Sequence, residues 1–127
     1  MLDLPSNMRV YLCSTPIDLR KSFDGLSAAV EAVFQRNVLD GHLFLFVNKR
    51  RDRIKALHWA TDGMVIWYKR LEVGVFELPA AAADRAQLTL DATALAMLLG
   101  GVPLATPRGK RYARSATADA QPTAPRA

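Results

Sequence analysis

The segment from residue 41 to residue 71 constrains the fold most, because it contains three consecutive runs of β-type residues. Residues 43–47 form an unbroken apolar run, which is typical of a strand buried on both faces. A polar loop follows, and residues 54–60 and 64–71 indicate two further strands. The intervening Asp62-Gly63 is a strong hairpin signal, because a type I′ turn requires positive φ at both central residues.

A two-residue loop at Asp62-Gly63 fixes which side chains of this hairpin share a face. Thr61 would face Met64, and Lys55 would face Arg70. The predicted core face then carries Leu57, Trp59, Met64, Ile66 and Tyr68. The other face carries Ala56, His58, Ala60, Val65, Trp67 and Lys69, and we expect it to be half covered by another element or used for binding. A four-residue loop would change these pairs.

The N-terminal part of the chain predicts one strand and one long helix. Residues 8–13 form a plausible first strand. Thr15 is a candidate N-cap, Pro16 fits the first helical position, and Asp18 fits a capping box. An apolar stripe then extends this predicted helix to about Gln35.

The C-terminal part predicts shorter elements. Residues 72–79 indicate a turn and a short edge segment, because Pro79 cannot extend a ladder of backbone hydrogen bonds. Residues 87–90 suit a short strand, and Asp91 is a good N-cap for a helix over residues 92–99.

These elements predict an α+β fold: an antiparallel sheet of about four to five strands, one long helix packed on it and a short C-terminal helix. The 127 residues suit a single domain, expected over residues 1–103. Pro, Ala, Thr and Arg dominate afterwards, which predicts a disordered basic tail over residues 104–127. Neither a membrane span nor a signal peptide is apparent, so we expect a cytoplasmic protein.

The net charge of +5 is concentrated in two parts of the chain. Residues 41–71 contain seven of the seventeen basic residues and only two of the twelve acidic ones. Residues 101–127 contain five basic residues and one acidic residue. Localised positive charge favours a polyanionic partner, with a solvated charged face as the alternative.

Several motifs at consistent spacing resemble one protein family. Residues 15–26 resemble its "DMRKGFDGL" segment, although Ser22 replaces the more usual glycine. Residues 41–46 resemble its "GxLFVF" segment, residues 55–71 its "KxLxW…DG…YKRL" pattern, and residues 95–101 its closing helix. The family comprises the second open reading frame of IS66-type insertion sequences, often called TnpB and distinct from the RNA-guided nuclease of that label. The resemblance covers about residues 8–103.

This resemblance implies a bacterial mobile-element accessory protein that supports transposition. Its implied partners are a separate DDE-type transposase and another element-encoded protein, with DNA at the element ends as the expected nucleic acid. The family supplies no established active site.

The candidate nucleic-acid contacts are basic residues, because Lys and Arg neutralise phosphates and release counterions. They are Arg20, Lys21, Lys49, Arg50, Arg51, Arg53, Lys55, Lys69 and Arg70. Arg20 and Lys21 would lie in the first helical turns, where the helix dipole disfavours cations, and this placement hints at an anionic partner. Trp67 and His58 would oppose each other, where base stacking competes with ordinary cross-strand packing.

We expect no catalytic residue, cofactor or metal site. Asp18, Asp24 and Asp62 form a conceivable Mg²⁺-binding nuclease set, but each also has a structural role. His42 and His58 lack partners at metal-ligand spacing. The favoured hypothesis is a DNA-binding accessory factor. The alternatives are a protein adaptor without direct DNA contact and, less favoured, a metal-dependent nuclease; oligomeric state remains open.

Overall fold

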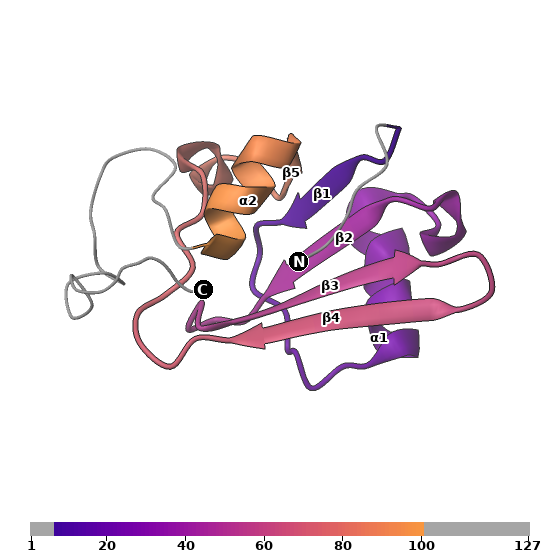
Figure 1. The fold of residues 1–127 in the computed structure, drawn as a ribbon, viewed down its shortest axis with the longest axis horizontal. Helices are drawn as coiled ribbons and strands as arrows, with labels where there is room; N and C mark the ends of the chain where they lie inside the picture. The colour runs from indigo at the N-terminus through magenta and orange to yellow at the C-terminus, as the bar shows by residue number, and fades with distance from the viewer. Residues whose placement is uncertain (1–6, 101–127) are drawn as a thin grey trace.

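The computed structural model describes residues 7–100, which form a sheet covered on both faces (Figure 1). Its strands are β1 (Val10–Cys13), β2 (Leu43–Val47), β3 (Arg53–Trp59), β4 (Met64–Arg70) and β5 (Gln87–Leu90), in the spatial order β4-β3-β2-β1-β5. The helical elements are α1 (Phe23–Ala29), the π-helical η1 (Val30–Phe34), the 3₁₀ turns η2 (Val38–Asp40) and η3 (Ala80–Ala83), and α2 (Ala92–Gly100).

The sheet is mixed, which corrects the prediction of a purely antiparallel sheet. β1 and β2 are parallel, with Val10 beside Leu43, whereas every other neighbouring pair is antiparallel. The α1–η1 segment connects β1 to β2, and such a crossover returns the chain to the same end of the sheet. The α+β class and the number of strands are confirmed, and the predicted tail lies outside the described residues.

The predicted long helix from Thr15 is wrong over its first part. Residues 14–21 form an irregular segment, in which the Ile17 amide donates to the Val47 carbonyl over 2.9 Å. The segment is therefore tied to the end of β2, and helix α1 begins only after its N-cap residue Ser22. Asp18 does not cap a helix, because its carboxylate binds Arg20 instead.

A π-helical turn shifts the buried stripe near the end of the helical segment. Val30 and Phe34 are buried, whereas Val33 is only partly buried. A π-helix has wider turns than an α-helix, so positions beyond it rotate relative to the predicted stripe. Phe34 then contacts the Phe44 ring of β2, with 5.3 Å between ring centroids.

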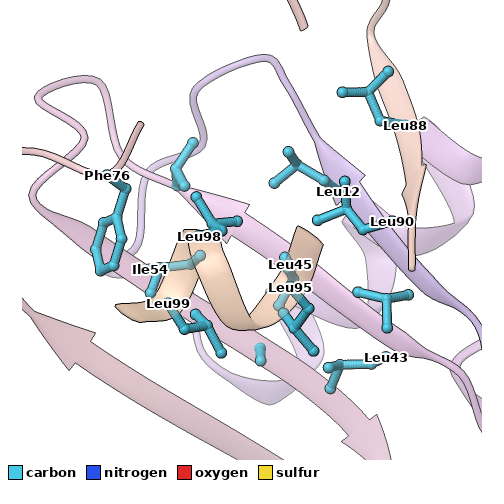
Figure 2. Close-up of a cluster of buried hydrophobic side chains, with 13 residues drawn as sticks. Leu12, Leu43, Leu45, Ile54, Phe76, Leu88, Leu90, Leu95, Leu98 and Leu99 are labelled. Atoms are coloured by element: carbon cyan, nitrogen blue, oxygen red, sulfur yellow. The ribbon is translucent and has the colours of Figure 1, made fainter. Parts of the chain in front are cut away.

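Each face of the sheet has its own apolar cluster. Helix α1 and η1 cover one face, where Leu26 and Val30 pack with Phe44, Phe46 and Leu57. Helix α2 covers the other face, where its leucines pack on residues from four strands and on Phe76 (Figure 2). Strand β2 is buried at all five positions because it lies between the two clusters, as its apolar run predicts.

The β3–β4 hairpin has a four-residue connection, which corrects the predicted register. Trp59 pairs with Met64, Lys55 with Tyr68 and Arg53 with Arg70. Positive φ occurs at Thr61 rather than at Asp62 and Gly63, so the type I′ turn does not form. The shift is by two residues, and because side chains alternate with period two, the predicted division of side chains between the faces is unchanged.

The C-terminal elements follow the predictions more closely. Strand β5 is present, and Asp91 caps α2 by accepting a hydrogen bond from the Ala94 amide over 2.7 Å. The segment over residues 72–79 contains no strand, yet it supplies the fully buried Phe76. Among the described residues, no helix combines the length and apolar character that crossing a bilayer requires.

Leu98→Ala tests whether the α2-side cluster stabilises the fold. Leu98 is fully buried, and losing a buried leucine side chain lowers the free energy of unfolding by about 2–5 kcal/mol. Leu39→Ala is the matched control, because Leu39 is 58% exposed and its loss costs less than about 0.5 kcal/mol. Urea unfolding measures both values, and equal losses would contradict the assignment of α2 to the core.

Candidate nucleic-acid interface

A cleft of about 730 Å³ opens between the irregular segment before α1 and the β2–β3 loop. It contains cationic, acidic and apolar side chains together with one aromatic ring. The lining residues are Pro16, Ile17, Asp18, Leu19, Arg20, Asn48, Lys49, Arg50, Asp52, Arg53 and Tyr68. The hydrogen bond from Ile17 to Val47 holds the two walls of the cleft together.

Asn48 organises the β2–β3 loop. Its Oδ1 accepts from the Arg53 amide over 3.0 Å, and its Nδ2 donates to Asp52 Oδ1 over 2.7 Å. The second bond stabilises the carboxylate and is the main reason why the pKa of Asp52 lies below its ordinary value. The loop thereby closes on itself, and the intervening Lys49 and Arg50 side chains are exposed to solvent.

Asp18 holds Arg20 on the opposite wall. Arg20 Nη2 donates to Asp18 Oδ2 over 2.7 Å, and Arg20 Nε lies 3.0 Å from both carboxylate oxygens. The Arg20 side-chain hydrogen bonds are the main cause that lowers the pKa of Asp18 to about 2, and the Arg20 amide adds to this effect. Asp18 therefore pairs with the guanidinium and partly offsets its charge, and the Arg20 side chain stays 91% exposed.

Tyr68 joins the cleft to the neighbouring sheet surface. Its hydroxyl accepts from Arg53 Nη1 over 3.1 Å, and Lys55 Nζ lies 4.9 Å from its ring centroid. Lys55 Nζ also donates to the Lys21 carbonyl over 2.9 Å. Tyr68 is 47% exposed, so the prediction that it is buried in the core is wrong. The basic residues beside it in the sequence were the signal for a surface site.

The structure brings only some of the predicted basic residues together. Arg20, Lys49, Arg50 and Arg53 line the cleft. Lys55 and Arg70 share the sheet face of Arg53, and Arg70 Nε lies 3.1 Å from Glu72 Oε2. Lys21 and Arg51 are exposed but do not line the cleft.

Lys69 lies on the other face of the sheet, which corrects its predicted place in the patch. It pairs with Ile54, and its Nζ donates to the Leu99 carbonyl at the end of α2 over 2.9 Å. Adjacent residues of a strand point to opposite faces, so the Lys69-Arg70 pair divides between them. Lys69 therefore contacts the α2 side of the molecule.

Trp67 and His58 do not oppose each other, because the hairpin register differs from the prediction. Trp67 pairs with Ala56, and His58 pairs with Val65. Trp67 is partly buried against the α2-side cluster, which is the packing role that competed with base stacking. Nδ1 of His58 is buried without a hydrogen-bond partner in the described structure.

The three candidate nuclease carboxylates belong to separate parts of the structure. Asp18 lies in the irregular segment, Asp24 in α1 and Asp62 in the hairpin turn. Among residues 7–100, no three His, Cys, Asp or Glu side chains are placed to hold a metal ion together.

Comparison with known protein families gives one match. The family described as "IS66 Orf2 like protein" matches residues 8–109. Two similar proteins come from Sinorhizobium fredii (strain NBRC 101917 / NGR234). "Uncharacterized protein y4hO" is 30% identical over 102 residues, which cover 80% of this chain and 87% of that protein. "Uncharacterized protein y4jC" is 32% identical over 79 residues, which cover 62% of this chain and 68% of that protein. No solved structure gives a significant match.

Arg20→Gln tests the ion pair with Asp18. Removing the guanidinium should raise the pKa of Asp18 from about 2 towards its ordinary value of 3.8. Because the folded-state pKa is lowered, the stabilisation from this pair is complete above the unfolded pKa and is lost as pH falls towards 2. Carbon-13 NMR titration of the Asp18 carboxyl measures the shift, and an unchanged pKa would show that Arg20 is not its cause.

Proposed function

We propose that this chain, which belongs to the IS66 Orf2-like family of insertion-sequence accessory proteins, is a non-catalytic DNA-binding factor in transposition. It would bind the phosphate backbone at the element ends and assist a separate DDE transposase. We also propose a cytoplasmic location, where such a factor would meet the element.

The convergence of Arg20, Lys49, Arg50 and Arg53 on one cleft supports this proposal most directly. These residues come from two segments far apart in the sequence. An exposed cation on a hydrogen-bonded loop meets a phosphate with less loss of conformational freedom than one on a mobile chain. The loop that Asn48 closes provides such a support for Lys49 and Arg50.

The charges within the cleft also favour an anionic partner. Among the described residues, Arg20 is paired with Asp18, whereas Lys49, Arg50 and Arg53 have no carboxylate within salt-bridge distance. Asp52 also lines the cleft and attracts Arg50 and Arg53, which leaves four cations against two carboxylates. Leaving exposed cations close together is mildly unfavourable, and a bound phosphate would relieve their repulsion. Contacts of this kind give affinity and position without reading the base sequence.

A protein adaptor is the second candidate, because part of the cleft is apolar. Pro16, Ile17 and Leu19 line the same wall as Arg20. A mixed apolar and cationic cleft also suits an acidic peptide, whose carboxylates would meet the cations and whose apolar side chains would fill the apolar part. Co-purification with the transposase that survives nuclease treatment, together with no affinity for duplex DNA, would favour this adaptor over the DNA-binding factor.

A Lys49→Ala/Arg50→Ala double variant tests the phosphate contacts. Each lost contact reduces the slope of log affinity against log salt by about 0.9, so the slope should fall by about 1.8. The loss of affinity should be similar for unrelated duplex sequences, because phosphate contacts carry no base information. Fluorescence anisotropy with labelled duplexes over a salt series measures both quantities.

Arg9→Ala is the matched control for this measurement. Arg9 is exposed, and its carbonyl accepts from the Leu43 amide at the start of β2, whereas the β2–β3 loop with Lys49 and Arg50 follows the end of β2. The Arg9→Ala substitution removes one positive charge far from the cleft, so the slope of log affinity against log salt should stay unchanged. An equal loss of slope per charge in both variants would mean that net charge, rather than the cleft, determines binding.

A further inference from the structure

The outer edge of β4 is the longest open edge of the sheet. β4 has seven residues and ends the strand order, and no strand of residues 7–100 pairs with its outer side. The edge strand at the opposite end, β5, has only four residues. Long open edges are sites of strand addition unless charges, prolines or bulges protect them, and the charges of β4 are confined to its last two residues.

The backbone hydrogen bonds define which groups this edge presents. Ala60 donates to Gly63 over 2.8 Å and Leu71 donates to Asp52 over 2.7 Å, at the two ends of the β3–β4 register. Bonded and non-bonded pairs alternate in an antiparallel ladder, so Val65, Trp67 and Lys69 bond to β3. The N–H and C=O groups of the remaining residues point outward. These residues are Met64, Ile66, Tyr68 and Arg70.

We infer that this edge binds the same edge of a second copy, forming an antiparallel β4–β4 pair centred on Trp67. Met64 then faces Arg70 of the other copy, and Ile66 faces Tyr68. Both residues of each such pair have outward backbone groups, so each pair exchanges two hydrogen bonds. All seven residues of β4 take part, and the interface joins two sheets into one.

The side chains agree with this register. Val65 faces Lys69, so no cation opposes another, whereas a parallel β4–β4 pair would place Lys69 beside Lys69 and Arg70 beside Arg70. The two Trp67 side chains meet at the two-fold axis as a non-hydrogen-bonded pair, where cross-strand side chains are closest. Val65 and Tyr68, which are 46% and 47% exposed, become partly covered.

The arrangement also has a consequence for the cleft. A two-fold axis between antiparallel edge strands is perpendicular to the sheet, so equivalent faces of both copies point the same way. Tyr68 lines the cleft and lies one residue from the axis. The two clefts would therefore lie side by side on one face. The dimer itself does not depend on DNA binding.

Mixed disulfide formation in the full chain tests the register. Val65→Cys and Lys69→Cys variants are oxidised separately and as an equal mixture. Val65 and Lys69 face each other only across the interface, so the mixture should give a disulfide-linked dimer and each variant alone should not. The native Cys13 is buried and gives no background. Light scattering of the unmodified protein should give about twice 14.0 kDa.

Ile66→Pro separates this edge from the fold. The Ile66 N–H points outward, so proline removes a hydrogen bond of the interface and none of the β3–β4 ladder. The variant should be monomeric with unchanged circular dichroism, and Thr89→Pro at the outer edge of β5 should stay dimeric. A monomeric native chain at high concentration would overturn the inference. So would a dimer without the mixed disulfide, or a chain that dimerises only after removal of residues 101–127.

Discussion

Burial of β2 between two apolar layers is the constraint on which the structure depends. Its five side chains alternate between the α1-side and α2-side clusters, and all are buried. A strand in this position must be central, so β1 and β3 lie beside it, and β4 and β5, whose side chains are less completely buried than those of β2, lie at the edges. The loop after β2 therefore leaves the core directly for the surface, where the basic cleft forms.

The same constraint explains what the sequence could predict. Residues 43–47 indicate a doubly buried strand because their apolar run is uninterrupted, and Asp91 indicates the start of α2 through a local cap. The predicted helix start failed because Thr15 and Pro16 form a good local signal that a long-range bond overrides, namely that of Ile17 to Val47. The parallel β1–β2 pair was missed for a similar reason, since it follows from how the crossover packs.

Only part of the spatial arrangement of the candidate site could be predicted from the sequence. The basic residues of the β2–β3 loop are adjacent in the sequence and are exposed on the same loop, so the proximity of Lys49 and Arg50 was predictable. Arg20 joins them only through tertiary structure. The position of Lys69 follows from the alternation of side chains along β4, which directs it towards Leu99 and away from the cleft. Tyr68 was assigned to the core because periodicity gives the face of a strand but not how far the covering helix reaches.

The proposed function requires the cationic cleft between the irregular segment and the β2–β3 loop to receive the phosphates of DNA. Amide chemical-shift mapping of the full chain during titration with a short duplex would locate the DNA-binding residues. If DNA binds in this cleft, the largest shifts should occur over residues 16–20 and 48–53, with small shifts at η3 and β5. The largest shifts at η3 and β5, or none at saturating duplex, would contradict the proposed function.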